Sequence, residues 1–593
     1  MRPLGDVPTL KPRWLRACAL AIMSLVLSTF AWWPMIAAYP HVQMGDGAQY
    51  HKTLEAARVS VVRYHEFPHW NPYECGGLAL WDNPQAPIGA PLAWPVYFAN
   101  GTTEVVYFWY VVHSALGFVC MWLLARHELK LDRFSTFVAA GVWAFAGFHQ
   151  QHYMGGHFTF VPFLYFPLAL LLWRRAEHDL RYGVGLGVLV AWMMMEGGVY
   201  PIPHLAVILF VETLTRVWPL ERLGRIAIAG AAAGPVALGL GAIRFLPVFD
   251  QLKRHTRAIG VETDALQWQT FKDMFLARTH EWTVQGQTYV WPEYGSYLGP
   301  IILGLAIVGV LTVKREHLWL LLLLAFSGAL MFGHAAKWAP WAFLKGHVFP
   351  FKEMRVPSRF RAEVTLFLAA FAGLAVHKLV THVRRLSLPW STADATRTAI
   401  VAIACLAVGD IVSLGMTRAE IAFQQPPEDR HPIIAPHIYL DGPGLAQMID
   451  QPRQNRGRIT CWDEWGFGAG APLWAGDVPQ ARSDDPDIVV TNVSRTQNTF
   501  TLDVDAKKPG RVLINSTYDR NFQTNVGTLI EDDKLLVLEV PAGENHVHIR
   551  NWPRYFNAGV TITLVTLFSV VAFFIGWPMV QRRRRAKLAP AGL

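Results

Sequence analysis

The sequence predicts a mostly α-helical, polytopic membrane protein with about twelve transmembrane helices and a C-terminal, extracytoplasmic, β-sandwich-like domain before the last helix. Hydrophobic residues make up 52% of the 593 residues and charged residues only 16%, which argues against an ordinary soluble protein. The apolar residues also fall in blocks close to the ~20 residues that cross ~30 Å of hydrocarbon. The net charge of +9 lies in short clusters between these blocks, a pattern typical of topology signals rather than of a nucleic-acid groove.

Basic residues between the apolar blocks predict the orientation of the chain. If both termini are cytoplasmic, the inside loops carry the clusters at 126–133, 174–181, 216–225, 314–315 and 378–397, and 582–585 lies in the tail. This alternation agrees with the positive-inside rule at every crossing. The predicted spanning helices are 14–37, 104–125, 134–149, 157–173, 182–196, 201–216, 224–245, 298–313, 317–333, 361–379, 398–416 and 557–580.

Three regions follow from this topology. Residues 1–416 form a transmembrane domain with a large first outer loop at 39–103, residues 417–556 form an extracytoplasmic β-rich domain, and residues 557–593 form the final helix and a basic cytoplasmic tail. Alternating or β-branched runs predict strands in the second of these regions, and a Pro-Ala-Gly turn separates two of them. The predicted strands are 511–518, 534–540 and 546–552.

The first outer loop holds a candidate catalytic acid. Asp46 stands between two glycines just outside the first helix. Glycines let the backbone bend sharply and leave room for a ligand, and a positioned carboxylate is a common general base. An Asx-turn that closes the helix end explains the same residues about as well.

The rest of this loop is rich in aromatic residues, prolines and glycines, which suits an ordered cover over a site. Trp70, Asn71 and Asp82 fit the positioning of a sugar, and they fit a well-packed interfacial loop equally well. Cys75 and Cys461 both fall in segments expected on the oxidising side, so a disulfide between them and two unpaired thiols are about equally expected.

Three histidines, His149, His152 and His157, fall within nine residues between the third and fourth predicted helices. Imidazoles can bind a metal or a phosphate. Their spacing matches no strong zinc pattern, and no neighbouring cysteine or carboxylate completes a site. We therefore expect no metal here, with these three as weak candidates, and favour histidines that face a phosphate at the outer membrane surface.

A dense cationic stretch at 349–361 precedes the tenth helix on the predicted outer side, where it opposes the positive-inside rule. Arg355 and Arg359 are candidates to bind a lipid-linked phosphate, because guanidinium groups present paired donors to phosphate oxygens. Binding to ordinary anionic head groups is the alternative.

Glu196 and Arg244 lie at or inside the predicted membrane edge and are candidates for substrate positioning. An ion pair between Arg244 and Asp410 is also compatible with the sequence.

Taken in order, these segments resemble the GT-C class of polytopic membrane glycosyltransferases and, within it, the YfhO-like bacterial membrane proteins. Arg244 stands where that family is expected to have glutamine, which leaves the role of this residue open. The resemblance covers nearly the whole chain and is carried by 45–47, 68–72, 83–85, 243–247, 297–300, 354–360 and 540–547.

The resemblance implies an enzyme of the cell envelope that moves a sugar from a polyprenyl-phosphate donor to an extracytoplasmic acceptor. In this hypothesis Asp46 removes a proton from the acceptor hydroxyl, and Arg355 and Arg359, with His157, stabilise the departing phosphate in a single inverting displacement. No cofactor is expected to be required, although a divalent cation is compatible with the chemistry. The expected location is the plasma (inner) membrane, with the active site on the extracytoplasmic face.

The alternative function is a transporter or flippase of lipid-linked saccharides. A transporter needs a polar path across the membrane, whereas the ionisable residues here gather on one face and no internal repeat is visible. The sequence does not identify the sugar, the acceptor (a glycan, a lipid or a protein), the enzyme that loads the carrier, the oligomeric state or the role of the β-rich domain. Nucleic acid is not an expected partner.

Overall fold

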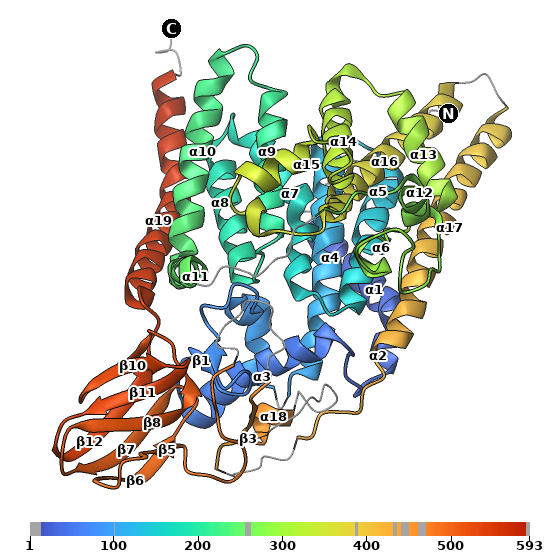
Figure 1. Ribbon diagram of the computed structural model, residues 1–593. Coiled ribbons are helices and arrows are strands. Elements are labelled where there is room, and N and C mark those ends of the chain that lie inside the picture. Colours follow the sequence, from blue (N-terminus) through green and yellow to red (C-terminus); the bar gives the residue numbers. More distant parts are fainter. Residues whose placement is uncertain are drawn as a thin grey trace.

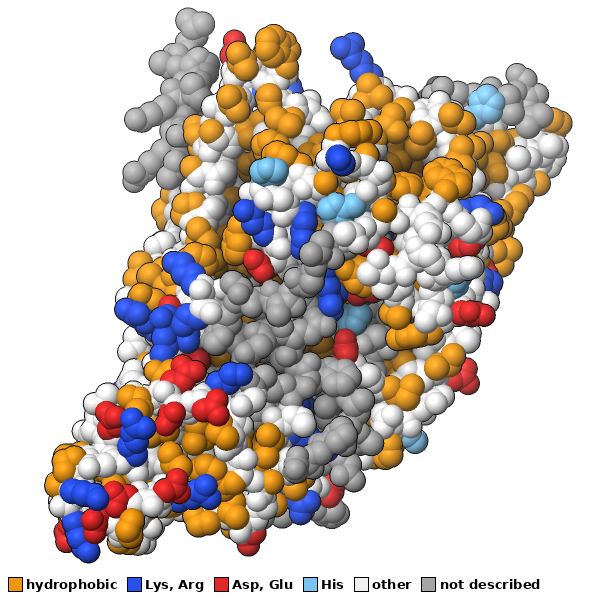
Figure 2. Space-filling model, in the orientation of Figure 1, with side chains coloured by type: hydrophobic (Ala, Val, Ile, Leu, Met, Phe, Trp, Pro, Cys, Tyr) orange, Lys and Arg blue, Asp and Glu red, His pale blue; other side chains and the backbone are white. Residues whose placement is uncertain are grey.

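The computed structural model describes residues 13–99, 101–254, 263–385, 389–430, 436–440, 450–460 and 470–588. A layer of helices forms the larger part of the molecule, and a β-rich domain lies at one end of it (Figure 1). Apolar side chains cover much of the visible surface of the helical layer, whereas Lys, Arg, Asp and Glu gather on the β-rich domain (Figure 2). This division matches a multi-pass membrane protein with one extramembrane domain.

The helices of the described residues are α1 (Arg13–Ala31), α2 (Trp33–Ala37), α3 (Asp46–Tyr64), α4 (Thr103–His127), α5 (Arg133–Phe145), α6 (Gly147–Met154), α7 (Phe166–Ala176), α8 (Leu180–Met195), α9 (Pro201–Leu214), α10 (Glu221–Leu240), α11 (Ala242–Arg254), α12 (Trp268–Leu276), α13 (Gly299–Leu311), α14 (Leu318–Met331), α15 (Pro340–His347), α16 (Arg361–Arg385), α17 (Trp390–Ala422), α18 (Asp450–Arg453) and α19 (Phe556–Leu588). Short 3-10 helices join some of them: η1 (Pro87–Gly89), η2 (Pro91–Tyr97), η3 (Phe158–Tyr165), η4 (Trp291–Glu293), η5 (Arg315–His317), η6 (Phe351–Glu353) and η7 (Pro357–Phe360).

Each of the twelve predicted spanning segments coincides with at least one helix. Within the described residues, six helices are long and apolar enough to cross a membrane, and three more are apolar but shorter. Helix α13, for example, has 13 residues, so it extends only ~20 Å at 1.5 Å per residue. The helical architecture is thus present, while the number of twelve complete spans stays a prediction.

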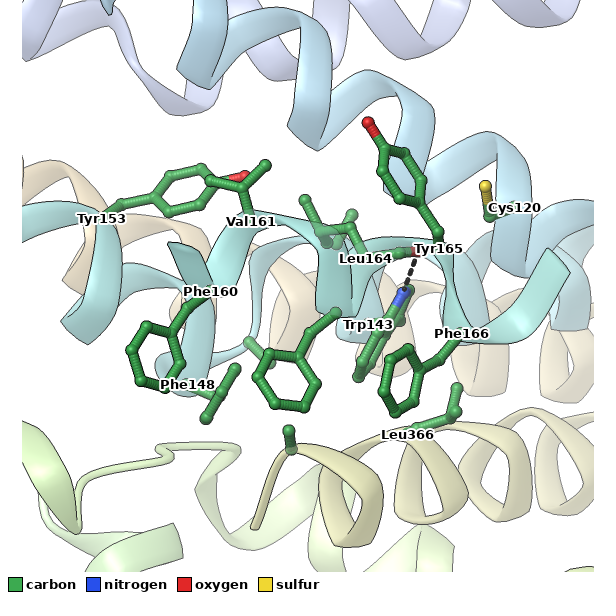
Figure 3. Packing of buried hydrophobic residues seen from close by; sticks show 14 of the residues in the cluster. Cys120, Trp143, Phe148, Tyr153, Phe160, Val161, Leu164, Tyr165, Phe166 and Leu366 are labelled. Atoms are coloured by element: carbon green, nitrogen blue, oxygen red, sulfur yellow. Dashed lines mark hydrogen bonds between the residues drawn. The ribbon is translucent and has the colours of Figure 1, made fainter. Parts of the chain in front are cut away.

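Buried aromatic side chains fill the centre of the helical layer (Figure 3). Trp143 of α5, fully buried, donates its indole N–H to the backbone oxygen of Leu164, 3.3 Å away. Phe166 lies beside it, Phe148 and Phe160 lie near each other farther along the same cluster, and all three are buried. This packing fixes η3, the segment that carries the residues directly after His157.

The β-rich domain is a sandwich of two four-stranded sheets. One sheet has the order β10-β11-β8-β5 and the other the order β6-β7-β12-β9, and the pairs between neighbouring strands are antiparallel. The strands are β5 (Ala481–Arg482), β6 (Ile488–Arg495), β7 (Thr499–Ala506), β8 (Gly510–Thr517), β9 (Phe522–Thr524), β10 (Thr528–Asp532), β11 (Leu535–Val540) and β12 (Gly543–Asn551). The predicted strands correspond to β8, β11 and β12.

Two smaller sheets connect the sandwich to the helices. β1 (Trp70–Asn71) pairs antiparallel with β2 (Leu78–Ala79) in the first outer loop, and β3 (Ile438–Leu440) pairs parallel with β4 (Arg456–Arg458). After the sandwich, α19 runs back along α10 and α11 (Figure 1).

The first outer loop contains a helix that the sequence did not predict. α3 has 19 residues and is too polar to be a membrane span, so the search for apolar blocks missed it. Its buried face carries charges that are paired: the Lys52 ammonium lies 2.7 Å from the Glu74 carboxylate, and the Arg453 guanidinium lies 3.1 Å from the Glu55 carboxylate. These pairs fix α3 against the rest of the loop and against α18.

The same loop is inserted into the β-sandwich. The indole of Trp70, a residue that is 2% exposed, belongs to the sandwich core and packs edge-on against Phe522. Its backbone N–H donates to the side chain of Asn498, and its backbone oxygen accepts from the side chain of Gln497. Trp70 therefore holds the loop and the sandwich together.

We predict that Trp70→Ala lowers the free energy of unfolding by about 3–5 kcal/mol, because it removes a large buried side chain from a packed core. Thermal unfolding of the purified protein, followed by tryptophan fluorescence, measures the change. The control is Trp94→Ala in the same loop, since Trp94 is 54% exposed. Equal losses in both variants would contradict the role given to Trp70.

Candidate functional site

Asp46 is the first residue of α3, at the end of the helical layer that faces the extramembrane part. The backbone of Gly45 before it has φ of 61°, a conformation that favours glycine. The segment before Asp46 is fixed on both sides: Met44 donates its backbone N–H to Ala422 of α17, and Tyr110 of α4 donates to the Gln43 side chain. The Asp46 side chain itself stays 44% exposed.

His157 holds the Asp46 carboxylate. The His157 Nε2 atom lies 3.1 Å from Asp46 Oδ2, and its Nδ1 atom lies 2.7 Å from Nδ1 of His152. The His152 Nε2 atom in turn lies 2.9 Å from Nη2 of Arg361, at the start of α16. Four side chains from three parts of the chain therefore form one hydrogen-bonded row from Arg361 to Asp46.

The guanidinium of Arg361 sets the direction of this row, because it can only donate. His152 must accept through Nε2, so the neutral imidazole of His152 carries its hydrogen on Nδ1 and donates to Nδ1 of His157. His157 then carries its hydrogen on Nε2 and donates to Asp46. We infer that both histidines are neutral in this arrangement and that Asp46 accepts.

Burial and charge agree with a neutral His152. Burial, and after it the positive charge of Arg361, lowers the pKa of His152 well below its ordinary value. The ring of Phe160 stacks on the His152 ring, with centroids 4.0 Å apart and planes 5° apart. The stacked ring fixes the orientation of the imidazole and with it the two hydrogen bonds.

Gly156 brings the histidine segment close to the backbone of Asp46. Its φ is 79°, and a Cβ atom there would lie 2.0 Å from the backbone nitrogen of Gly47. Any side chain at this position would push the two segments apart. The sequence showed the two adjacent glycines before His157 but gave no sign of this contact.

Arg359 lies beside the row but is already paired. Its Nε atom donates to the Glu293 carboxylate over 3.0 Å, and its guanidinium stacks on the rings of Phe160 and Tyr200. Arg359 is 5% exposed. The guanidinium that the sequence proposes for a donor phosphate is therefore already paired with Glu293, and its contact with a phosphate stays a prediction. Arg355, half-buried, stands four residues before Arg359 in the chain.

Trp70 and Asn71 do not reach this site. Trp70 is inside the β-sandwich, and Asn71, 1% exposed, uses its side-chain oxygen to accept from the backbone N–H of Tyr73. Of the two interpretations of this loop, the burial of both side chains favours the packed interfacial segment, and a contact with a sugar stays a prediction. Composition alone could not separate them, because both require ordered aromatic residues.

Glu196 and Arg244 are also buried away from Asp46. Glu196 accepts from His113 over 2.9 Å and from Tyr165 over 3.0 Å, so it joins helices within the layer. Arg244 donates to the backbone oxygen of Asn83 over 2.7 Å and supports the first outer loop. The alternative pair between Arg244 and Asp410 does not form, because Asp410 instead binds Arg278 and Tyr297.

The remaining residues that the sequence analysis singled out are His149, Cys75 and Cys461. His149 packs edge-on against Trp143 rather than joining His152 and His157. In the part of the chain that the structure describes, no three His, Cys, Asp or Glu side chains are placed to hold a metal ion. Cys75 is disulfide-bonded. Cys461 lies outside the described residues, so the Cys75–Cys461 pair stays a prediction.

Asp82 lies where the first outer loop meets α11 and the β-sandwich. Its carboxylate accepts from the side chain of Asn521 over 3.1 Å, and the residue is 1% exposed. Burial, and after it the negative charge of Asp519, raises the pKa of Asp82 to about 8. Asp82 thus links the first outer loop to the β-sandwich, and its contact with a sugar stays a prediction.

We predict that Asp82→Asn stabilises the protein at pH 8 and has little effect near pH 4. The native pKa lies above the unfolded value, so wild-type stability is present at low pH and is lost as the pH rises through about 8. The difference between variant and wild type should grow by up to about 1.4 kcal/mol per pH unit. Unfolding midpoints of both proteins, measured from pH 4 to pH 8, test this prediction. A stability difference between variant and wild type that does not change with pH would contradict it.

The sequence matches no protein-family model and no curated protein. Solved structures show a distant similarity. An oligosaccharyltransferase from Archaeoglobus fulgidus, in complex with an inhibitory peptide and a dolichol-phosphate, is 11% identical, with a TM-score of 0.45, over 76% of this chain and 64% of that one. An arabinofuranosyltransferase, AftD, from Mycobacteria is 15% identical, with a TM-score of 0.38, over 69% of this chain and 27% of that one. The chain thus spans less than two thirds of the length of either protein.

Proposed function

We propose that the protein is a membrane glycosyltransferase of the GT-C class, similar to the YfhO-like proteins, that moves a sugar from a polyprenyl-phosphate donor to an extracytoplasmic acceptor. The supporting observation is the carboxylate of Asp46, which is exposed at the end of the helical layer and oriented by a neutral His157. A lipid-linked donor places its sugar phosphate at this level of the membrane. The acceptor is a glycan, a lipid or a protein.

In the proposed reaction Asp46 acts as the general base. His157 occupies Oδ2, and Oδ1 makes no hydrogen bond to the residues that the structure describes, so Oδ1 is the oxygen that takes the acceptor proton. The acceptor oxygen forms a bond to the anomeric carbon as the bond from that carbon to the phosphate breaks. The phosphate leaves with the electron pair, and the anomeric centre is inverted.

The cationic stretch acts on the leaving phosphate through Arg355 in this proposal. Arg359, already bound to Glu293, holds Phe160 and therefore the histidines in place, so it is a positioning residue. The same proposal places the site on the extracytoplasmic face of the plasma membrane and both termini in the cytoplasm. A transporter is not favoured, since the buried carboxylates Glu196 and Glu363 each pair locally with a histidine at 2.9 and 2.8 Å.

We predict that Asp46→Asn lowers the transfer rate ~10²- to 10⁴-fold, because the amide cannot take the acceptor proton. The measurement uses purified protein, labelled polyprenyl-phosphate sugars and membrane extract, and follows the label into products. Asp477→Asn is the matched control, since Asp477 is an exposed carboxylate of the extramembrane region. A rate near wild type for Asp46→Asn in a folded protein would reject the role of the base.

His157 variants separate orientation from simple packing in the same assay. His157→Gln keeps an N–H donor near the position of Nε2, whereas His157→Phe keeps the ring volume and loses the donor. We expect the glutamine variant to retain more activity than the phenylalanine variant at equal unfolding midpoints. The reverse order would contradict the role given to the hydrogen bond.

We predict that activity survives removal of divalent cations. A phosphate is a good leaving group, and the proposed base and cation are supplied by the protein itself. Transfer measured in excess EDTA should stay within about twofold of the untreated rate. Activity lost in EDTA and restored by manganese or magnesium would overturn this part of the proposal.

A further inference from the structure

A pocket of ≈ 580 Å³ lies at the other end of the helical layer. It is formed by the ends of α4, α7 and α9 and the starts of α8, α10 and α14, together with η5. Its lining residues are His127, Glu128, Lys130, Arg174, Arg175, Glu177, His178, Tyr182, Arg216, Arg222, Glu316, His317 and Trp319. This volume falls in the range of small-molecule and cofactor sites.

Helix α4 shows how far this pocket lies from Asp46. Tyr110, in the second turn of α4, contacts Gln43 near the candidate site, and His127, the last residue of α4, lines the pocket. The 17 residues that follow Tyr110, up to His127, rise about 26 Å along the helix axis, which is close to the thickness of the hydrocarbon core of a bilayer. The α9–α10 and α13–α14 connections are also at the end of the layer away from the β-strands (Figure 1).

The floor of the pocket is a fixed set of ion pairs. Arg174 lies 2.6 Å from Glu128 and 2.6 Å from Glu212, and Arg216 lies 3.0 Å from Glu177 and 2.7 Å from Glu212. The Arg174 guanidinium also stacks on the ring of Trp319, 4.2 Å from its centroid. Arg216 is 8% exposed, and its buried Nε atom has no hydrogen-bond partner. Such a donor needs an acceptor.

The wall of the pocket carries cations without acidic partners. Three lining cations form no ion pair within the described residues: Lys130, Arg175 and Arg222. The lining carboxylates pair with other cations: Glu128 with Arg174, Glu177 with Arg216, and Glu316, 4.0 Å away, with Lys314. Positive charge therefore remains uncompensated around a concave space. Cations that serve only as topology signals do not need to surround a cavity.

We propose that this pocket binds the phosphate group of an anionic ligand. Guanidinium groups and an ammonium around a half-open cavity suit phosphate oxygens. Two of the lining histidines, His178 and His317, lie 3.1 and 3.7 Å from Glu177 and Glu316 and leave these cations to the ligand. The pocket lies at helix ends, where the head group of a membrane lipid would sit, and a basic pocket between transmembrane helices is a known way to hold such a head group. A soluble phosphate would satisfy the same side chains.

The test measures binding to full-length protein in a neutral detergent. The probes are dioctanoyl phosphatidic acid, dioctanoylglycerol as the same chains without the phosphate, and inorganic phosphate. Arg175→Gln combined with Arg222→Gln removes two pocket cations. Arg133→Gln combined with Arg225→Gln removes two exposed cations that do not line the pocket.

We expect phosphatidic acid to bind, dioctanoylglycerol not to bind, and the pocket variant to bind at least about tenfold more weakly while the control variant stays within twofold. Binding of inorganic phosphate that competes with the lipid would assign the site to a soluble phosphate. No binding of either phosphate, or equal weakening in both variants, overturns the proposal. If the double pocket variant does not fold, the exposed Lys130→Gln replaces it, with a smaller loss expected.

Discussion

The buried guanidinium of Arg361 is the group on which the candidate site depends. It is fully buried and donates to the backbone oxygens of four residues, so it cannot move without leaving several acceptors unsatisfied. These four are Pro292, Glu293, Gly295 and Ser358. Its remaining donor is directed at His152. Because a guanidinium cannot accept a hydrogen bond, this contact orders the histidines as far as Asp46. The exposed carboxylate is therefore oriented from inside the protein.

The β-sandwich contributes to the same rigidity from the outside. Trp70 is part of the sandwich core, and α3, which begins at Asp46, is tied to the same loop by the buried Lys52–Glu74 pair. These contacts connect the sandwich to the helix that begins at Asp46. Asp82 adds a protonated carboxyl group to the junction, which makes the junction more stable at low pH than at high pH. The sandwich thus packs against the loop that carries the candidate site.

The sequence was informative where one local pattern decides the outcome. Apolar blocks located the helices, strand alternation located β8, β11 and β12, and the glycines around Asp46 indicated an unusual backbone. The sequence was uninformative where a side chain contacts a residue that is distant in the chain. Nothing near Arg359 indicates Glu293, which lies 66 residues away, and nothing near Trp70 indicates the sandwich core, more than 400 residues away. For this reason the sequence could not show that Arg359 is paired with Glu293 or that Trp70 is buried in the sandwich, although Asp46 and His157 lie together.

Charge is distributed in opposite ways at the two ends of the helical layer. Near Asp46 the arginines are the compensated groups, Arg359 by Glu293 and Arg361 by backbone oxygens, and a carboxylate is left exposed. In the basic pocket the carboxylates are the compensated groups, and Arg175 and Arg222 are left without an acidic partner among the described residues. The positive-inside rule explains why cations gather at one end. It does not explain why one end leaves a carboxylate without a cationic partner and the other leaves guanidinium groups without an acidic one. The two ends therefore differ in the charge that they leave uncompensated, a carboxylate at one and guanidinium groups at the other.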